Sequence, residues 1–154
     1  SASYSRTGLG TDNSVAIVAN ELVDGASFGI GTGTNVISNT SEDDMTTVFA
    51  TYATGPMTFG VQLSEIDKTA ANSDVDREHA SLSFAVNENL SISYGISNVK
   101  YESSSKSDEE SSGFSASYTM GGMTLGAVAN KSDSLLGTAG TDRSFTEVSL
   151  AFAF

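Results

Sequence analysis

The sequence contains no cysteine and a single proline, and its basic residues are scarce. Without cysteine, neither a disulfide framework nor a cysteine-ligated zinc or iron–sulfur site can form. Only 7 Lys and Arg stand against 19 Asp and Glu, which leaves a net charge of −12. This balance excludes a protein that tracks nucleic-acid phosphates, because such a protein needs a basic face. Uninterrupted apolar runs are only a few residues long, so the sequence predicts no transmembrane helix.

The length and the glycine content bound the organisation of the chain. A chain of 154 residues has the usual size of one domain, and we expect residues 1–154 to form a single domain. The chain has 15 glycines beside its one proline. This composition is typical of strands that are joined by glycine-based turns.

Apolar and polar residues alternate along most of the chain, and the clearest case is the C-terminus. There the apolar residues occupy every second position, while the positions between them hold Glu147, Ser149 and two alanines. The same period recurs in 57–63, 82–86, 90–96 and 114–120. Helical spacing fits none of these segments, so the pattern predicts an all-β protein. The apolar residues of the last strand are Val148, Leu150, Phe152 and Phe154.

Short and long connections alternate between these segments. We expect short turns at 54–56, 87–89 and 121–122, and long polar loops at 33–44, 67–77, 102–112 and 132–142. Extending the phase toward the N-terminus adds strands near 27–32 and 15–20, with a partial one at 1–5. The result is an antiparallel up-and-down meander of about ten strands.

The alternation alone fits a soluble sandwich or barrel as well as a membrane barrel. Two features favour the membrane. The non-apolar face consists of Ser, Thr, Gly and Ala rather than the Lys and Glu that coat soluble sheets, and the charges gather in the long loops. Strands of about ten residues with aromatic side chains near their ends also match tilted membrane-spanning strands. In lipid, only a closed barrel satisfies every backbone group, so spanning strands imply closure.

Two groups of residues resemble a known family. The terminal Ser149–Phe154, with alternating hydrophobic residues and a final Phe, is similar to the last strand of Gram-negative outer-membrane proteins. The hairpins Tyr52–Val61 and Tyr118–Gly126 resemble those of general diffusion porins of alphaproteobacteria. This resemblance covers most of Thr47–Phe154 and is weaker before it. It implies a transmembrane β-barrel in the Gram-negative outer membrane.

The family pattern has sixteen strands and about twice these residues. We therefore interpret the chain as the C-terminal part of such a porin, and a complete small barrel of eight to ten strands is the competing interpretation. The resemblance also implies a homotrimer, contact with outer-membrane lipid and lipopolysaccharide, and recognition of the last strand by the barrel-assembly machinery. The constriction loop of the family, which comes mainly from the N-terminal half, has no visible counterpart.

The sequence contains residues for two other chemistries, a histidine-based catalytic pair and a calcium site. His79, the only histidine, could pair with a serine as a catalytic base, but no G-x-S-x-G motif is present, and we expect a polar residue at the loop end of a strand. The acidic loops lack the spaced ligand order of a dedicated calcium site, so we expect no cofactor and no metal site, with at most loosely bound calcium shared with lipopolysaccharide phosphates.

The strand phase identifies candidate lumen residues. Hydroxyl groups around a water-filled lumen let small polar solutes pass without tight binding, which suits a diffusion channel rather than an enzyme. Arg143 and Glu147 share a face and are expected near the mouth. The competing prediction is a closed barrel or surface protein with a structural or adhesive role, and a secreted soluble β-domain is a third. The candidate pore-lining residues are Thr58, Gln62, Ser81, Ser83, Ser91, Ser93, Ser115, Ser117, Arg143, Glu147 and Ser149.

The loop lengths also predict the orientation of the chain. Long loops of outer-membrane barrels face outward and short turns face the periplasm, so Phe154 is expected at the inner rim. Most of the negative charge then lies outside and should favour cations modestly. The residues of this predicted acidic rim are Glu42, Asp43, Asp44, Asp74, Asp76, Asp108, Glu109 and Glu110.

Overall fold

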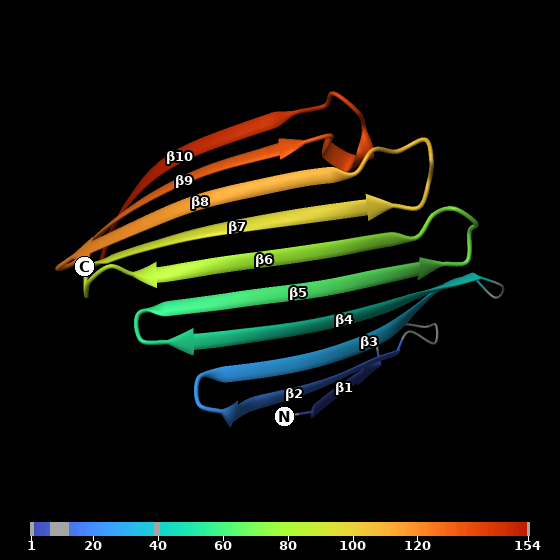
Figure 1. Cartoon of the computed structure of the whole chain (residues 1–154), viewed down its shortest axis with the longest axis horizontal. Coiled ribbons are helices and arrows are strands. Elements are labelled where there is room, and N and C mark those ends of the chain that lie inside the picture. The colour runs from blue at the N-terminus through green and yellow to red at the C-terminus, as the bar shows by residue number, and fades with distance from the viewer. Residues whose placement is uncertain (1, 7–12, 39–40, 154) are drawn as a thin grey trace.

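The computed structural model describes residues 2–6, 13–38 and 41–153, and in this part the chain forms ten strands and one short 3₁₀ helix (Figure 1). The strands pair antiparallel in sequence order, each beside the next, which confirms the predicted all-β up-and-down arrangement. No helix of these residues is long and apolar enough to cross a membrane. The elements are β1 (Ala2–Arg6), β2 (Asn13–Val23), β3 (Ala26–Ser38), β4 (Ser41–Thr54), β5 (Met57–Lys68), β6 (Val75–Ala85), β7 (Leu90–Tyr101), β8 (Glu109–Met120), β9 (Met123–Asp133), η1 (Leu135–Gly137) and β10 (Arg143–Phe152).

Several strands extend further than the alternation predicts. The predicted loop at 33–44 is largely strand, because β3 and β4 continue their pairing from Gly33 opposite Met45 to Ser38 opposite Ser41, with a register shift between Val36 and Ser38. Polar residues here prolong the ladder beyond the apolar part of the strands, since solvated side chains do not interrupt backbone pairing. The predicted N-terminal strand is present as β1, although Ser1 lies outside the described residues.

Tight turns join the strands at one end of the sheet. Gly55 and Gly121 have positive φ angles of 53° and 59° and occupy the first position of two-residue turns, where glycine is favoured. The Asn87 side chain accepts hydrogen bonds from the backbone N–H groups of Asn89 and Leu90, both at 2.9 Å. A further turn, Asp24-Gly25, was not predicted, although Asp-Gly is a strong hairpin signal.

The sheet is a single layer. Among the described residues, each strand has substantial contacts only with its sequence neighbours, apart from the contact of η1 with β8, and only Ala26 and Val75 are buried apolar residues. The last strand is not packed into a two-sheet core, because Leu150 and Phe152 are 54% and 57% exposed. In this part of the chain β1 and β10 do not pair, so the sheet is open, as in part of a barrel.

Candidate functional site: the polar wall and the charged end of the sheet

One face of the sheet carries a band of apolar side chains. The band contains no charged residue from β3 to β10, and its side chains are largely exposed, such as Val61 at 53%. An exposed apolar surface of this extent needs an apolar environment. The apolar band comprises Phe28, Ile30, Val48, Ala50, Tyr52, Met57, Phe59, Val61, Leu63, Ala80, Leu82, Phe84, Leu90, Ile92, Tyr94, Ile96, Phe114, Ala116, Tyr118, Met120, Met123, Leu125, Ala127, Ala129, Val148, Leu150 and Phe152.

The apolar band crosses the strands obliquely. Phe59 of β5 lies in one register row with Ala129 of β9, the last apolar residue of its strand. On β5, however, the band continues to Leu63, four residues further along. Four residues at about 3.3 Å each, over four strand spacings of about 4.8 Å, correspond to a tilt of about 35°. Tilts of this size are typical of strands in membrane barrels.

All eleven candidate pore-lining residues lie on the opposite face, which we call the polar wall. Register pairing shows this directly, because Thr58 pairs with Ser83, Ser83 with Ser93, and Ser93 with Ser115. The other candidates fall on the same face by the alternation of side chains along each strand. These are Gln62, Ser81, Ser91, Ser117, Arg143, Glu147 and Ser149.

Hydroxyl groups of neighbouring strands bond to one another across the polar wall. The Ser93 and Ser115 hydroxyls are 2.7 Å apart, and the Thr47 hydroxyl donates to Ser64 at 3.2 Å. Gln62 also donates to the Ser64 hydroxyl, at 3.2 Å. A hydroxyl can both donate and accept, so these groups retain capacity for bonds to water or solute.

Every glycine within a described strand lies on the polar wall. Because glycine has no side chain, the wall is thin at these positions, and some neighbouring side chains lie over the space. A Cβ at Gly126 would lie 2.7 Å from the Ser149 hydroxyl, and a Cβ at Gly60 would lie 3.0 Å from the Ser81 hydroxyl. The glycines are Gly29, Gly31, Gly33, Gly60, Gly95, Gly113 and Gly126.

The residues of the predicted acidic rim gather at the end of the sheet opposite the tight turns, where β4, β6 and β8 begin. They do not form one ring, because the alternation divides them between the two faces. Asp44, Asp76 and Glu110 continue the apolar face beyond the band, whereas Asp43 and Glu109 continue the polar wall. Glu42 continues the apolar face opposite Val36, and Asp74 and Asp108 lie in loops.

Several carboxylates at this end hold loop backbone. The Glu109 carboxylate accepts from the backbone N–H of Leu136 at 2.9 Å, and Asp74 accepts from that of Lys68 at 2.8 Å. On the apolar face beyond the band, Lys100 forms an ion pair with Glu78 at 2.9 Å. The charged end is therefore partly an ordered network.

The loop between β9 and β10 folds back over the polar-wall side of this end. The backbone N–H of Ser107 donates to the Gly137 carbonyl at 3.0 Å. A Cβ added to Gly137 would lie 2.8 Å from the Tyr101 ring, and the Lys106 ammonium lies 4.2 Å from the centre of that ring. Since Tyr101 continues the polar wall, this loop covers the charged end of that wall rather than projecting freely.

His79 lies in the middle of β6, not at the loop end of a strand as predicted. It faces the polar wall between Gln62 and Ser97, its register partners on β5 and β7. The error has a simple cause: the sequence predicts β6 to begin after Arg77, whereas its pairing with β5 begins at Val75. Over the residues that the structure describes, no group of three or more His, Asp or Glu side chains is arranged to hold a metal ion.

Several polar-wall residues were not identified from the sequence. Asn130 and Ser132 of β9 and Phe145 of β10 lie on this wall. The alternation of β9 contained the signal for the first two. The alternation of β10 also places Phe145 on this wall, between Arg143 and Glu147, but its apolar side chain does not mark it as a pore-lining residue.

Comparison with known protein families identifies the family to which the chain belongs. A family model described as Gram-negative porin matches residues 1–154. The chain belongs to the Gram-negative porin family. The match extends the resemblance over the N-terminal strands, which the hairpin motifs alone did not cover.

Membership of this family places the porin in the outer membrane and in a class that is in general non-enzymatic. A search of curated proteins and a search of solved structures each gave no match. Val148, Leu150 and Phe152 of the predicted assembly signal lie on the apolar face of β10, and Phe154 lies outside the described residues.

Proposed function

We propose that this porin is a passive diffusion channel for small hydrophilic solutes and ions across the outer membrane. The observation that carries the proposal is the division of one single-layered sheet into an uncharged apolar band and a wall that is rich in hydroxyls, amides and glycines. Lipid covers the band and water fills the space beside the wall. Solutes pass without tight binding because each wall group exchanges its bonds readily with water.

The orientation follows from the two ends of the sheet. The tight turns lie on the periplasmic side and the charged end lies outside, as long loops do in this class of barrel. Carboxylates such as Asp43 and Glu109, which continue the polar wall, then bias the mouth toward cations. Ions screen this bias, so it falls as the salt concentration rises.

We further propose three associations that the family suggests. The porin assembles as a homotrimer, and the barrel-assembly machinery recognises β10. Outer-membrane lipid covers the apolar band, while lipopolysaccharide lies against Asp76, Glu78 and Lys100 beyond it. Its phosphates share calcium loosely with these carboxylates and contact the lysine directly.

Single-channel recording in planar bilayers tests the channel. We expect stepwise conductance increments, with a reversal potential across a salt gradient that indicates modest cation selectivity at low salt. Clear anion selectivity at low salt would contradict the orientation. A correctly folded protein without conductance steps would instead favour a closed barrel with a structural or adhesive role.

A further inference from the structure

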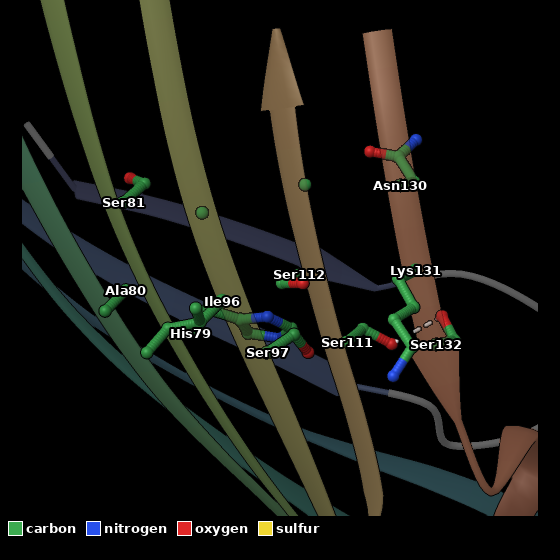
Figure 2. Close-up of a pocket in the computed structure, with 12 residues that line it drawn as sticks. His79, Ala80, Ser81, Ile96, Ser97, Ser111, Ser112, Asn130, Lys131 and Ser132 are labelled. Carbon is green, nitrogen blue, oxygen red and sulfur yellow. Dashed lines mark hydrogen bonds between the residues drawn. The ribbon is translucent and has the colours of Figure 1, made fainter. Parts of the chain in front are cut away.

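The polar wall contains a hollow between β6 and β9. The hollow has a volume of about 480 Å³, and its floor is backbone. Figure 2 shows the His79 side chain extending toward Ser97, with the hydroxyls of Ser111 and Ser132 further along the same row. These last two hydroxyls are 2.7 Å apart. The row therefore presents a continuous line of polar groups along one side of the hollow.

Gly95 gives the hollow its depth, whereas the space over its partner Gly113 is covered by the Asn130 amide, which a Cβ there would meet at 2.5 Å. Gly95 of β7 pairs directly with Gly113 of β8, so two adjacent strands have no side chain at this height. A Cβ built at Gly95 meets no atom closer than 3.6 Å, which is ordinary contact. Packing therefore leaves room for a side chain at Gly95, and its absence leaves open space.

A second hollow of about 200 Å³ continues the first across β4 to β6. His79 and Ser81 line both hollows, and Phe49 lies at the far end of the second. We call the two hollows together the transverse groove. The transverse groove runs across the strands from β4 to β9. A solute bound in it therefore lies across the strands rather than parallel to them.

The groove is chemically suited to an uncharged polyhydroxylated ligand. Its hydroxyl and amide groups each donate and accept, as the hydroxyls of a sugar do. No carboxylate lines it, and the side chain of Lys131 belongs by register to the apolar face, where its ammonium is paired with Asp133 at 2.7 Å. A charged solute would leave water without gaining an opposite charge to pair with in the groove, which is unfavourable, whereas an uncharged solute needs no such partner.

An exposed aromatic ring lies beside the groove. Phe145 is 53% exposed on the polar wall, whose other apolar residues include Phe49 and Val128, and it pairs with Asn130, which lines the larger hollow. A flat ring next to hydrogen-bonding groups matches a pyranose, whose C–H face is apolar and whose rim carries hydroxyls.

We propose that the transverse groove, with Phe145 at its end, is a weak binding subsite for uncharged sugars. The subsite rests on the proposed channel and refines it: sugars pause at the wall, while ions and non-saccharide solutes pass without pausing. Occupancy narrows the water-filled path, so a bound sugar interrupts the ion current.

Current recordings from the whole protein in bilayers test this, with maltotriose as the probe. Polyethylene glycol of the same hydrodynamic radius serves as a probe that has no pyranose ring. We expect maltotriose to add current interruptions with an apparent Kd on the order of 10 mM, and the polymer to add none beyond its steric effect.

Matched variants locate the subsite. Phe145→Ala should weaken the maltotriose effect at least threefold, whereas Phe145→Tyr should retain it. The control is Thr146→Ala, the neighbouring residue on the apolar face. Gly95→Ala should weaken the effect mildly and Gly95→Leu should abolish it, because each side chain fills the hollow. All variants are first shown to give conductance steps without sugar.

The outcomes separate the two proposals. Steps without sugar-specific interruptions, or interruptions that persist unchanged in Phe145→Ala and Gly95→Leu, overturn the subsite and leave the channel intact. A wild-type protein that gives no steps overturns both.

Discussion

Strand β9 shows the difference between the two faces of the sheet most simply. Leu125, Ala127 and Ala129 lie on the apolar face, and Gly126, Val128 and Asn130 alternate with them on the polar wall. Both sets share one backbone and one ladder of hydrogen bonds. The apolar set suits contact with lipid chains, and the wall set leaves space and polar groups for water. Moving one residue along the strand therefore moves a side chain from one environment to the other.

The largest expected effect comes from placing a charge on the two faces in turn. Val61→Arg puts a guanidinium in the middle of the apolar band, so we expect a loss of about 2–4 kcal/mol in the free energy of unfolding. Urea titration in lipid vesicles measures this loss. The control is Gln62→Arg, one residue further on the polar wall, whose effect should stay within about 0.5 kcal/mol. Equal losses in the two variants would contradict the assignment of the faces.

An intermediate effect is expected from enlarging neighbouring residues of β9. Gly126→Val places a branched side chain against the Ser149 hydroxyl, so stability should fall by about 1 kcal/mol and conductance should decrease. Ala127→Val adds methyl groups toward lipid and should leave both quantities nearly unchanged. Unfolding titrations and single-channel conductance measure the pair. A conductance loss in Ala127→Val alone would reverse the faces.

The smallest effect concerns selectivity. Glu147 lies on the polar wall, whereas Glu78 lies on the apolar face and is paired with Lys100. Removing the wall charge with Glu147→Gln should lower the cation-to-anion permeability ratio by less than about twofold, and more clearly at low salt. Reversal potentials across a salt gradient measure the ratio. Glu78→Gln should leave it unchanged, and a larger change there than in Glu147→Gln would show that the ions pass along the other face.

Much of this structure could be predicted from local pattern, and the errors have identifiable causes. All eleven candidate wall residues share a face because a period of two depends only on neighbouring residues. The strand ends were less predictable, as 33–44 shows, because polar residues beyond the apolar band prolong pairing without altering the hydrophobic pattern. His79 was misplaced for the same reason. The Asp24-Gly25 turn, in contrast, follows from a purely local signal, because Asp-Gly favours a two-residue hairpin turn.

The sequence by itself determined the class of the fold, the alternation of the two faces and the grouping of loops and turns at opposite ends, because each depends on residues close together in the chain. Only the tertiary structure decided which residues meet across strands. Gly95 faces Gly113, and Asn130 faces Phe145, because ten strands pair in one particular register. A shift of that register by two residues would leave every side chain on its present face, but it would separate the residues that form the transverse groove. The tilt of the apolar band likewise follows from register, since it compares positions on different strands.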